Sequence, residues 1–138
     1  MIFEFLKEKE IDSLINLLEE AFTLKANKET IKESLNNKNI RFLCAKEDNK
    51  VIGTIMITTK INPVTNKNGF YLDYVSVLES YQNRKIGAKM MLEVEKIAKE
   101  ENISYIEFTS SSKRIYARKL YLSLGYELRD TGVFIKNI

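Results

Sequence analysis

The 138-residue chain has no histidine, no tryptophan, one cysteine and one proline. Without histidine, it cannot contain a Ser-His-Asp triad, a Cys-His pair or a histidine-ligated zinc site. A single cysteine excludes an internal disulfide framework. Cys44 stands in an apolar stretch with no adjacent basic residue, which favours a buried and inert thiol. These absences exclude several classes of hydrolase, metalloprotein and small secreted protein.

Charge and hydropathy limit the class of protein further. The chain carries 22 Lys and Arg against 19 Asp and Glu, a net charge of +3. That balance suits a protein that handles an anionic ligand, but it is too low for a dedicated nucleic-acid binder. The charges at Glu4 and Lys7 argue against a signal peptide, and no apolar run approaches the roughly 20 residues that span a membrane. We therefore expect a soluble, cytoplasmic protein that binds neither nucleic acid nor membrane, with one domain over residues 1–138.

Apolar periodicity predicts alternating strands and helices. Strands are predicted at residues 2–5, 40–45, 51–61, 70–77, 103–108, 126–128 and 133–135. Helices are predicted at residues 11–22, 30–35, 86–98 and 117–124, the last followed by Gly125 at a position typical of a helix end. A strand–helix–strand crossover among mostly antiparallel strands predicts an α/β fold, with a central mixed sheet of six or seven strands and helices on both faces.

The turn between the strand at residues 70–77 and the long helix that follows is a candidate anion site. Its sequence is Gln82-Asn83-Arg84-Lys85-Ile86-Gly87-Ala88. Free backbone N–H groups and the positive end of the helix dipole converge at a helix N-terminus, and the Arg-Lys pair adds positive charge there. From these residues alone, an ordinary solvated turn is an equally good interpretation.

Two segments resemble the GNAT superfamily of N-acetyltransferases. Residues 82–87 are similar to the loop Q/R-x-x-G-x-G/A that holds the pyrophosphate of acyl-CoA, and they match it at Gln82 and Gly87, with Lys85 in place of the first glycine. Residues 117–126, ARKLYLSLGY, are similar to the late signature A-x-x-F/L-Y-x-x-L-G-F/Y. The resemblance implies the GNAT fold, in which the two central parallel strands pair and then splay apart.

The resemblance also implies the reaction and the site. The reaction is transfer of an acetyl group from acetyl-CoA to a primary amine, by direct attack in a ternary complex that needs no metal. The implied cofactor contacts come from the strand residues Val75, Ser76 and Val77 and from the loop residues Gln82, Asn83, Arg84, Lys85, Ile86, Gly87 and Ala88. Tyr121 is the implied general acid for the leaving thiolate, although its spacing alone also fits a core aromatic.

Two carboxylates are candidates for the base that deprotonates the amine. Asp73 stands in the strand at 70–77, where alternation predicts that it shares a face with Val75 and Val77. Glu107 occupies the strand position at which some members of the family carry their base. For each residue the alternative is a salt-bridged or edge-facing carboxylate, and a chain of water molecules can replace both.

No recognisable motif in the sequence identifies the acceptor amine. Its pocket is expected from residues 19–38 and from the hairpin at residues 61–69. Small-molecule amines and peptide amines both remain open, as do a monomer and a homodimer. The main alternative function is a catalytically silent acyl-CoA-binding or regulatory module with the same fold, which Lys85 in place of the loop glycine allows.

Overall fold

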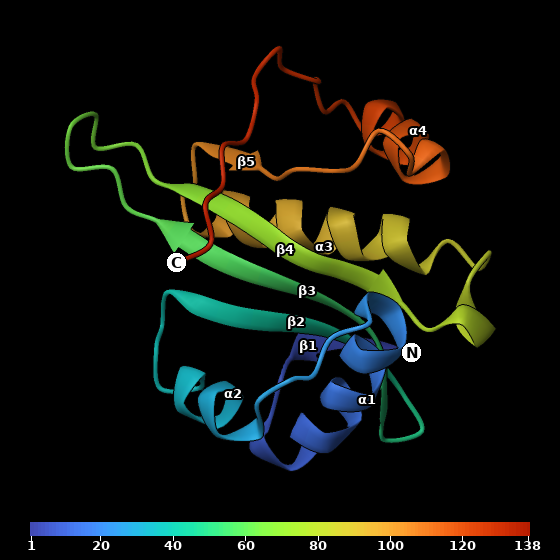
Figure 1. Ribbon diagram of the computed structural model, residues 1–138. Helices are drawn as coiled ribbons and strands as arrows, with labels where there is room; N and C mark the ends of the chain where they lie inside the picture. Colours follow the sequence, from blue (N-terminus) through green and yellow to red (C-terminus); the bar gives the residue numbers. More distant parts are fainter. The chain divides into compact units, whose positions relative to one another are not determined.

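The computed structural model describes residues 1–138, which form two compact units, Met1–Phe108 and Thr109–Ile138 (Figure 1). The first unit holds a five-stranded sheet and most of the helices. The second unit holds one helix, α4 (Ile115–Ser123). All predicted site residues except Tyr121 belong to the first unit.

The strands of the first unit lie in the order β1-β2-β3-β4-β5. Their bounds are Ile2–Phe5 for β1, Ile40–Glu47 for β2, Lys50–Lys60 for β3, Gly69–Val77 for β4 and Tyr105–Glu107 for β5. Neighbouring strands are antiparallel from β1 to β4. Strand β5 is parallel to β4, because the chain crosses over between them through a helix. The predicted mixed sheet is therefore confirmed for these five strands.

Helices cover both faces of this sheet. α1 (Ile11–Phe22) and α2 (Lys28–Ser34) lie on one face, and the crossover helix α3 (Ile86–Glu100) lies on the other (Figure 1). The 3-10 turns η1 (Glu8–Glu10) and η2 (Glu79–Tyr81) come before α1 and α3. The predicted helices on both faces are thus confirmed, and the two faces of the sheet have different neighbours.

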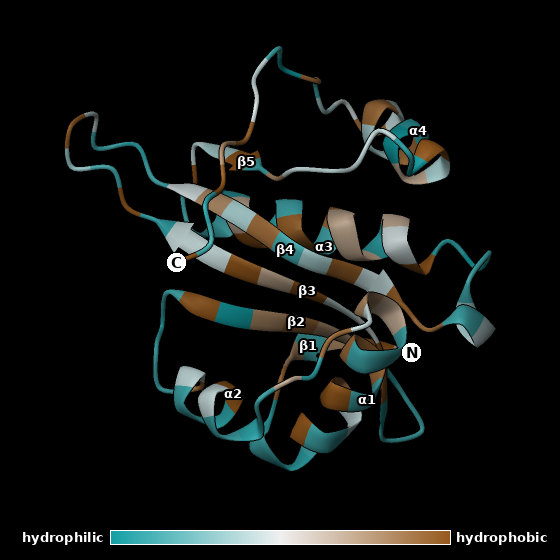
Figure 2. Cartoon of the chain, in the orientation of Figure 1, coloured by the Kyte–Doolittle hydropathy of each residue, from teal (hydrophilic) through white to brown (hydrophobic).

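The apolar stripes that predict α1 and α3 are also what pack these helices on the sheet. The buried side chains are Ile11, Leu14, Leu17 and Leu18 on α1, and Ile86, Met90, Met91, Val94, Ile97 and Ala98 on α3. Figure 2 shows hydrophobic and hydrophilic residues alternating around the helices. Each stripe removes apolar surface from water, worth roughly 25 cal/mol per Å², so tertiary packing rather than helix propensity holds both helices in place.

Gly53 of β3 lets α3 approach the sheet. A Cβ atom at this position would lie 2.9 Å from Sδ of Met90 on α3 and 3.3 Å from the carbonyl oxygen of Ser76 on β4. Met90 is itself fully buried and has little room to move. A larger residue at position 53 would therefore push α3 away from the strands that carry the candidate site.

A buried cation joins the start of the chain to the sheet. The ammonium of Lys46 on β2 lies 2.8 Å from Oε1 of Glu10 and 3.3 Å from Oε1 of Glu4, and it donates to the carbonyl oxygen of Phe5 at 3.1 Å. Burial alone would lower the pKa of Lys46, but the hydrogen bonds and charges of Glu10 and Glu4 together raise it. Lys46 therefore stays charged and holds β1, η1 and β2 together.

The two strands predicted near the C-terminus are wrong. Residues 126–128 and 133–135 form no strand, so the sheet has five strands rather than six or seven. The side chains of Leu128, Val133 and Ile135 are exposed, and Phe134 is 100% exposed. An alternating or β-branched sequence favours an extended chain, but a strand forms only where a partner supplies backbone hydrogen bonds and a face to cover. Neither segment has such a partner.

The helix predicted at residues 117–124 is confirmed in the second unit, and its end explains part of the late signature. The N–H of Gly125 donates to the carbonyl oxygen of Leu122, and the N–H of Tyr126 donates to that of Tyr121, both at 3.1 Å. With φ of +93° at Gly125, these two bonds form a Schellman cap. The Leu-Gly-Tyr sequence at the end of the late signature therefore terminates helix α4.

Candidate active site

Strands β4 and β5 pair over a short length. Gly69, Phe70 and Tyr71 pair with Tyr105, Ile106 and Glu107, and β5 ends there. β4 continues alone to Val77, paired only with β3 on its other edge. The parallel pairing expected of these two strands is observed, and it covers only the first three residues of β4.

The unpaired edge of β4 presents backbone groups. The N–H of Leu78 donates to the carbonyl oxygen of Ile52 at 2.8 Å, so at this point the chain faces β3. Because backbone N–H and C=O groups alternate between the two edges of a strand, those of Val75 and Val77 face the unpaired edge. A ligand that carries amide groups can pair with this edge as a further strand would.

A β-bulge interrupts β4 just before this edge. Thr54 pairs with Ser76 and Met56 pairs with Asp73, so the one residue between them on β3 stands opposite two residues on β4. Tyr74, at the bulge, has a left-handed backbone with φ of +55°. The extra residue shifts the alternation by one position.

The predicted shared face of Asp73, Val75 and Val77 is therefore wrong. Asp73 is paired with Met56, which lies on the face covered by α1 and α2. Val77 is paired with Gly53, whose missing side chain would point at α3 on the opposite face. Val75 is in phase with Val77, beyond the bulge, and Asp73 alone lies on the face of α1 and α2.

The loop after β4 leads directly to the N-terminus of α3. The side-chain amide of Gln82 donates to the carbonyl oxygen of Val77 at 3.2 Å, which ties the loop to the end of β4. The N–H of Lys89 makes the first helical bond, to the carbonyl oxygen of Lys85 at 3.1 Å. The N–H groups of residues 86–88 precede it and have no partner within the helix. Together with the helix dipole, they make this helix start a candidate anion site, as the sequence predicts.

Two residues of this loop have a left-handed backbone. Asn83 has φ of +65°, and Lys85, the N-cap of α3, has φ of +59°. Glycine adopts this conformation without strain, whereas other residues lose roughly 1–2 kcal/mol in it. A glycine here, as in the family pattern, would adopt this backbone without strain, whereas Lys85 adopts it with strain.

Positive charge accompanies the loop. The guanidinium of Arg84 lies over the ring of Tyr81, 5.0 Å from its centroid, in a cation–π contact. The Lys85 side chain follows it at the N-cap of α3. The predicted arrangement of a strand end, a basic turn and a helix start is therefore present within one compact unit.

The two candidate bases differ in their surroundings. Burial raises the pKa of Asp73 above its ordinary value. Glu107 pairs with Lys60 at 3.4 Å and is 42% exposed, as a salt-bridged carboxylate would be. Glu107 is paired in register with Tyr71, two residues before Asp73, so both carboxylates lie on the sheet face that α1 and α2 cover.

Tyr121 lies on α4 in the second unit. Its side chain is buried, and burial raises the pKa of its hydroxyl more than the charge of Arg114 lowers it. The hydroxyl is therefore protonated at neutral pH. This is the protonation state that a general acid requires.

The single cysteine is inert, as predicted. Cys44 is fully buried on β2, and burial raises the pKa of its thiol to about 12 despite the hydrogen bond with Thr54. A thiol with such a pKa is protonated at neutral pH and is not a nucleophile.

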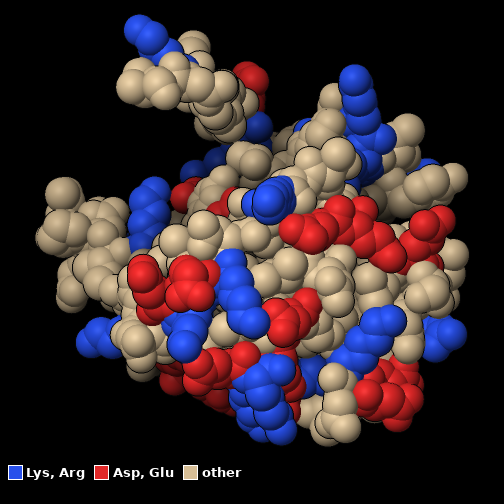
Figure 3. Space-filling view, turned by 60° about the horizontal axis from the view of Figure 1, so that its bottom comes forward, with Lys and Arg blue, Asp and Glu red and all other residues tan.

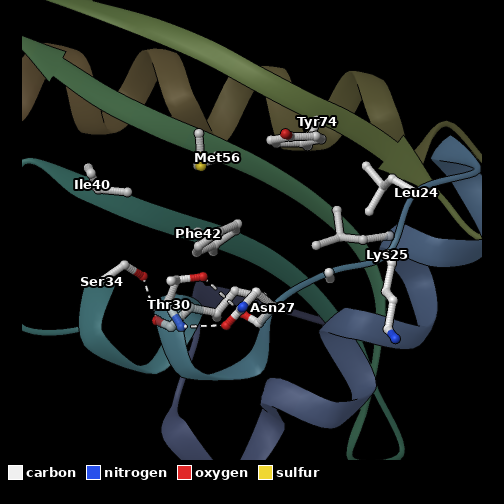
Figure 4. Close-up of a pocket in the computed structure, with 12 residues that line it drawn as sticks. Leu24, Lys25, Asn27, Thr30, Ser34, Ile40, Phe42, Met56 and Tyr74 are labelled. Carbon is white, nitrogen blue, oxygen red and sulfur yellow. Dashed lines mark hydrogen bonds between the residues drawn. The ribbon is translucent and has the colours of Figure 1, made fainter. Parts of the chain in front are cut away.

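A pocket of about 470 Å³ opens between α2 and the sheet (Figure 4). The residues that line it are Leu18, Leu24, Lys25, Ala26, Asn27, Thr30, Ile31, Ser34, Ile40, Phe42, Met56 and Tyr74. Small-molecule sites commonly have volumes of about 300–1,000 Å³. The pocket lies on the same face of the sheet as Asp73, since Met56, the register partner of Asp73, is part of its wall.

Sequence reasoning locates one wall of this pocket and misses the other. Residues of the range 19–38, in the loop after α1 and in α2, line this pocket, and their role in binding an acceptor stays a prediction. The hairpin at residues 61–69 contributes nothing to the lining, and Phe42, Met56 and Tyr74 of the sheet take its place. The alternation along the two predicted strands at 40–45 and 51–61 could have placed Phe42 and Met56 on the pocket face, but only if the register of their hairpin were known.

Charged side chains are mixed on the face that carries α1 and α2. Lys28 pairs with Asp12 at 2.9 Å and Lys32 with Glu8 at 3.2 Å, and Figure 3 shows basic and acidic side chains interleaved.

No three His, Cys, Asp or Glu side chains are grouped so that they could hold a metal ion. None of the helices combines the length and the hydropathy needed to cross a membrane.

Comparisons with solved structures define the fold class. A protein of Agrobacterium tumefaciens proposed to be an acetyltransferase superposes with a TM-score of 0.90 at 14% identity, covering 99% of this chain and 100% of its own. An aminoglycoside acetyltransferase from an uncultured soil sample gives 0.86 at 21%, covering 99% and 95%. A Clostridium acetobutylicum protein predicted to be an acetyltransferase, solved with acetyl-CoA, gives 0.79 at 20%, covering 98% and 95%. The chain has the acetyltransferase fold that these structures share.

The family follows from the sequence match. A sequence model described as the acetyltransferase (GNAT) family matches residues 11–126, which include every candidate site residue. The chain belongs to the GNAT family of acetyltransferases and is a transferase enzyme, of a family that uses acetyl-CoA. No curated protein matches the chain.

The left-handed backbone at position 85 gives a prediction of stability. Lys85→Gly should raise the free energy of unfolding by about 1 kcal/mol, because glycine adopts positive φ without strain. The matched control is Lys89→Gly inside α3, which should lower it by about 1 kcal/mol. Urea unfolding followed by circular dichroism measures both changes. A lower stability for Lys85→Gly would contradict the strain assigned to this residue.

Proposed function

We propose that the protein transfers an acetyl group from acetyl-CoA to a primary amine, with both substrates bound at once. The observation that carries this proposal is the unpaired edge of β4 followed directly by the N-terminus of α3. These two features suit the two parts of the donor, an arm rich in amides and a pyrophosphate with negative charge.

The donor fits this sequence of backbone groups. Val75 offers its N–H and C=O groups, and Val77 its C=O group, to the amides of the pantetheine arm, with Ser76 between them. The pyrophosphate lies at the free N–H groups of Ile86, Gly87 and Ala88, within reach of Arg84 and Lys85. We assign the whole loop, Gln82 to Ala88 with Asn83 at its left-handed turn, to this role.

The chemical step is attack of the amine nitrogen on the thioester carbonyl carbon. The C–N bond forms while negative charge develops on the carbonyl oxygen, and the C–S bond then breaks to give an amide and the CoA thiolate. Starting from the ammonium form, the nitrogen loses two protons, one to the base before attack and one after the C–N bond forms. The thiolate gains one proton and the other passes to solvent, so the protons balance. The backbone N–H of Val77 is the donor we assign to the oxyanion.

Asp73 is the better of the two candidate bases. Burial raises its pKa, and a carboxylate with a higher pKa accepts a proton more readily. Its register partner Met56 lines the pocket, so Asp73 lies on the side from which an acceptor approaches. Glu107 forms a salt bridge with Lys60 and is the weaker candidate.

Tyr121 is the proposed general acid, and the late signature supports this role. The tyrosine gives its proton to the thiolate and recovers one from solvent.

We propose that residues 1–138 act as one acetyltransferase domain, since the family match runs from residue 11 to residue 126 through both units.

The first prediction from this proposal concerns CoA binding. Gly87→Asp places a carboxylate among the N–H groups that receive the pyrophosphate, so Kd for CoA should rise at least about tenfold. An aspartate in the first turn also stabilises the helix, and the fold should survive. The control is Gly132→Asp, the same substitution where nothing lies within 4 Å of an added Cβ atom. Calorimetry that gives equal affinities would refute the loop assignment, and CoA binding without turnover of any amine would identify a silent binding module.

The second prediction separates the two bases by pH. Asp73→Asn should lower kcat/KM at least about tenfold at pH 7, where the acceptor amine is protonated, and less at pH 10, where it is neutral. The parent should lose activity as pH falls through the raised pKa of Asp73, because the carboxyl group then holds its proton. Glu107→Gln is the control and should keep the parent profile. If both variants keep it, the base is water or another group.

The third prediction concerns the acid. Tyr121→Phe removes one oxygen and keeps the ring, so kcat should fall at least about tenfold while Kd for CoA and Tm change little. Tyr116→Phe on the same helix is the control, since that side chain is 87% exposed. Thiol release from acetyl-CoA measures both variants. Full turnover by Tyr121→Phe would make this residue a core aromatic only.

A further inference from the structure

We propose that the acceptor is a monoamine whose remaining group is apolar, either alkyl or aromatic, and that this group fills the pocket between α2 and the sheet. The inference rests on the proposed function, because it names the substrate class of the same site. It concerns only residues of the first unit.

The floor and one wall of the pocket are apolar. Phe42 on β2, Met56 on β3 and Tyr74 on β4 form a row across the sheet, and Leu24 faces them from the loop after α1 (Figure 4). Tyr74 stands at the bulge of β4 and is braced by the ring of Phe22, with centroids 5.4 Å apart in an edge-to-face contact. A flexible methionine between two rings suits an alkyl or aromatic group.

The polar side chains of the opposite wall already have partners. Oδ1 of Asn27 accepts from the N–H of Thr30 at 3.1 Å, and the hydroxyl of Thr30 donates to the carbonyl oxygen of Asn27 at 3.1 Å. The hydroxyl of Ser34 donates to the carbonyl oxygen of Ile31 at 2.6 Å. These bonds cap and close α2, as the dashed lines of Figure 4 show. The two hydroxyl protons and Oδ1 of Asn27 are therefore used within α2.

The charges around the pocket oppose a polyamine. None of the twelve lining residues is acidic, and Lys25 is basic. A desolvated ammonium needs a carboxylate partner. Asp73, the register partner of Met56, can serve the reacting nitrogen, and no lining residue supplies a carboxylate for a second ammonium. The pocket therefore suits an acceptor with one amine and differs in this from a site for a polyamine.

Methionine labelling tests the inference directly. The chain has four methionines, of which Met90 and Met91 are buried in the core and Met56 lines the pocket. With CoA present, phenethylamine and hexylamine should each shift the ¹³C-methyl signal of Met56 in a saturable way and leave the two core signals in place. 1,5-Diaminopentane, similar in length to hexylamine but with a second ammonium, should need at least about tenfold higher concentration. Equal or tighter binding of the diamine, or no movement of the Met56 signal, would overturn the inference.

A charge introduced into the wall should reverse the preference. Leu24→Glu supplies the missing carboxylate and should shift the ratio of Kd values towards 1,5-diaminopentane at least tenfold. Leu92→Glu, a half-exposed position on α3 at the other face of the sheet, is the matched control and should leave the ratio unchanged. Met56→Gln is a second variant that keeps the length of the side chain and should weaken phenethylamine binding about tenfold. An unchanged ratio in Leu24→Glu with normal Tm would count against the inference.

Thiol release separates this inference from the proposed function. If phenethylamine binds at Met56 and no amine releases thiol from acetyl-CoA, the proposed transfer fails while the ligand class stands. If thiol is released and 1,5-diaminopentane is the better acceptor, the transfer stands and the ligand class fails.

Discussion

Strand β4 pairs with β5 over three residue pairs and then continues without a neighbour on that edge. Unpaired backbone N–H and C=O groups at the edge of a strand can form hydrogen bonds with another extended chain. The free edge of β4 can therefore bind an extended partner. The chain leaves β4 through a short basic turn into α3, which adds unpaired N–H groups directly after the unpaired edge. The candidate site is therefore made chiefly of backbone, and this explains how it persists with side chains that match the family pattern only in part.

The bulge at Tyr74 divides β4 into two functional halves. Before it, Asp73 lies on the face of α1 and α2, next in register to the pocket wall at Met56. After it, Val75 and Val77 are displaced by one position, and their backbone groups face the unpaired edge. In the proposed mechanism, this one inserted residue places the proton-accepting side chain of Asp73 and the hydrogen-bonding edge of the strand so that neither blocks the other.

Much of this fold could be predicted because its signals are local. The apolar stripes of α1 and α3, the strands around residue 48 and the basic turn before α3 all follow from neighbouring residues. What the sequence could not supply depends on partners far along the chain. The bulge appears only when β3 fixes the register of β4, and the extended segments 126–128 and 133–135 look like strands until the absence of a pairing edge is known. The left-handed backbone of Lys85 could not be predicted either. A lysine prefers other backbone angles, and only the surrounding structure forces this one.

An unpaired strand edge has a consequence for the protein in solution as well as for its chemistry. Such an edge is a template on which any extended peptide can add, including the β4 edge of another copy. A donor that pairs with Val75 and Val77 would compete for the same hydrogen bonds, so occupancy would also act as protection against self-association. Under the proposed function, binding of the acyl donor would therefore also limit association through this strand edge.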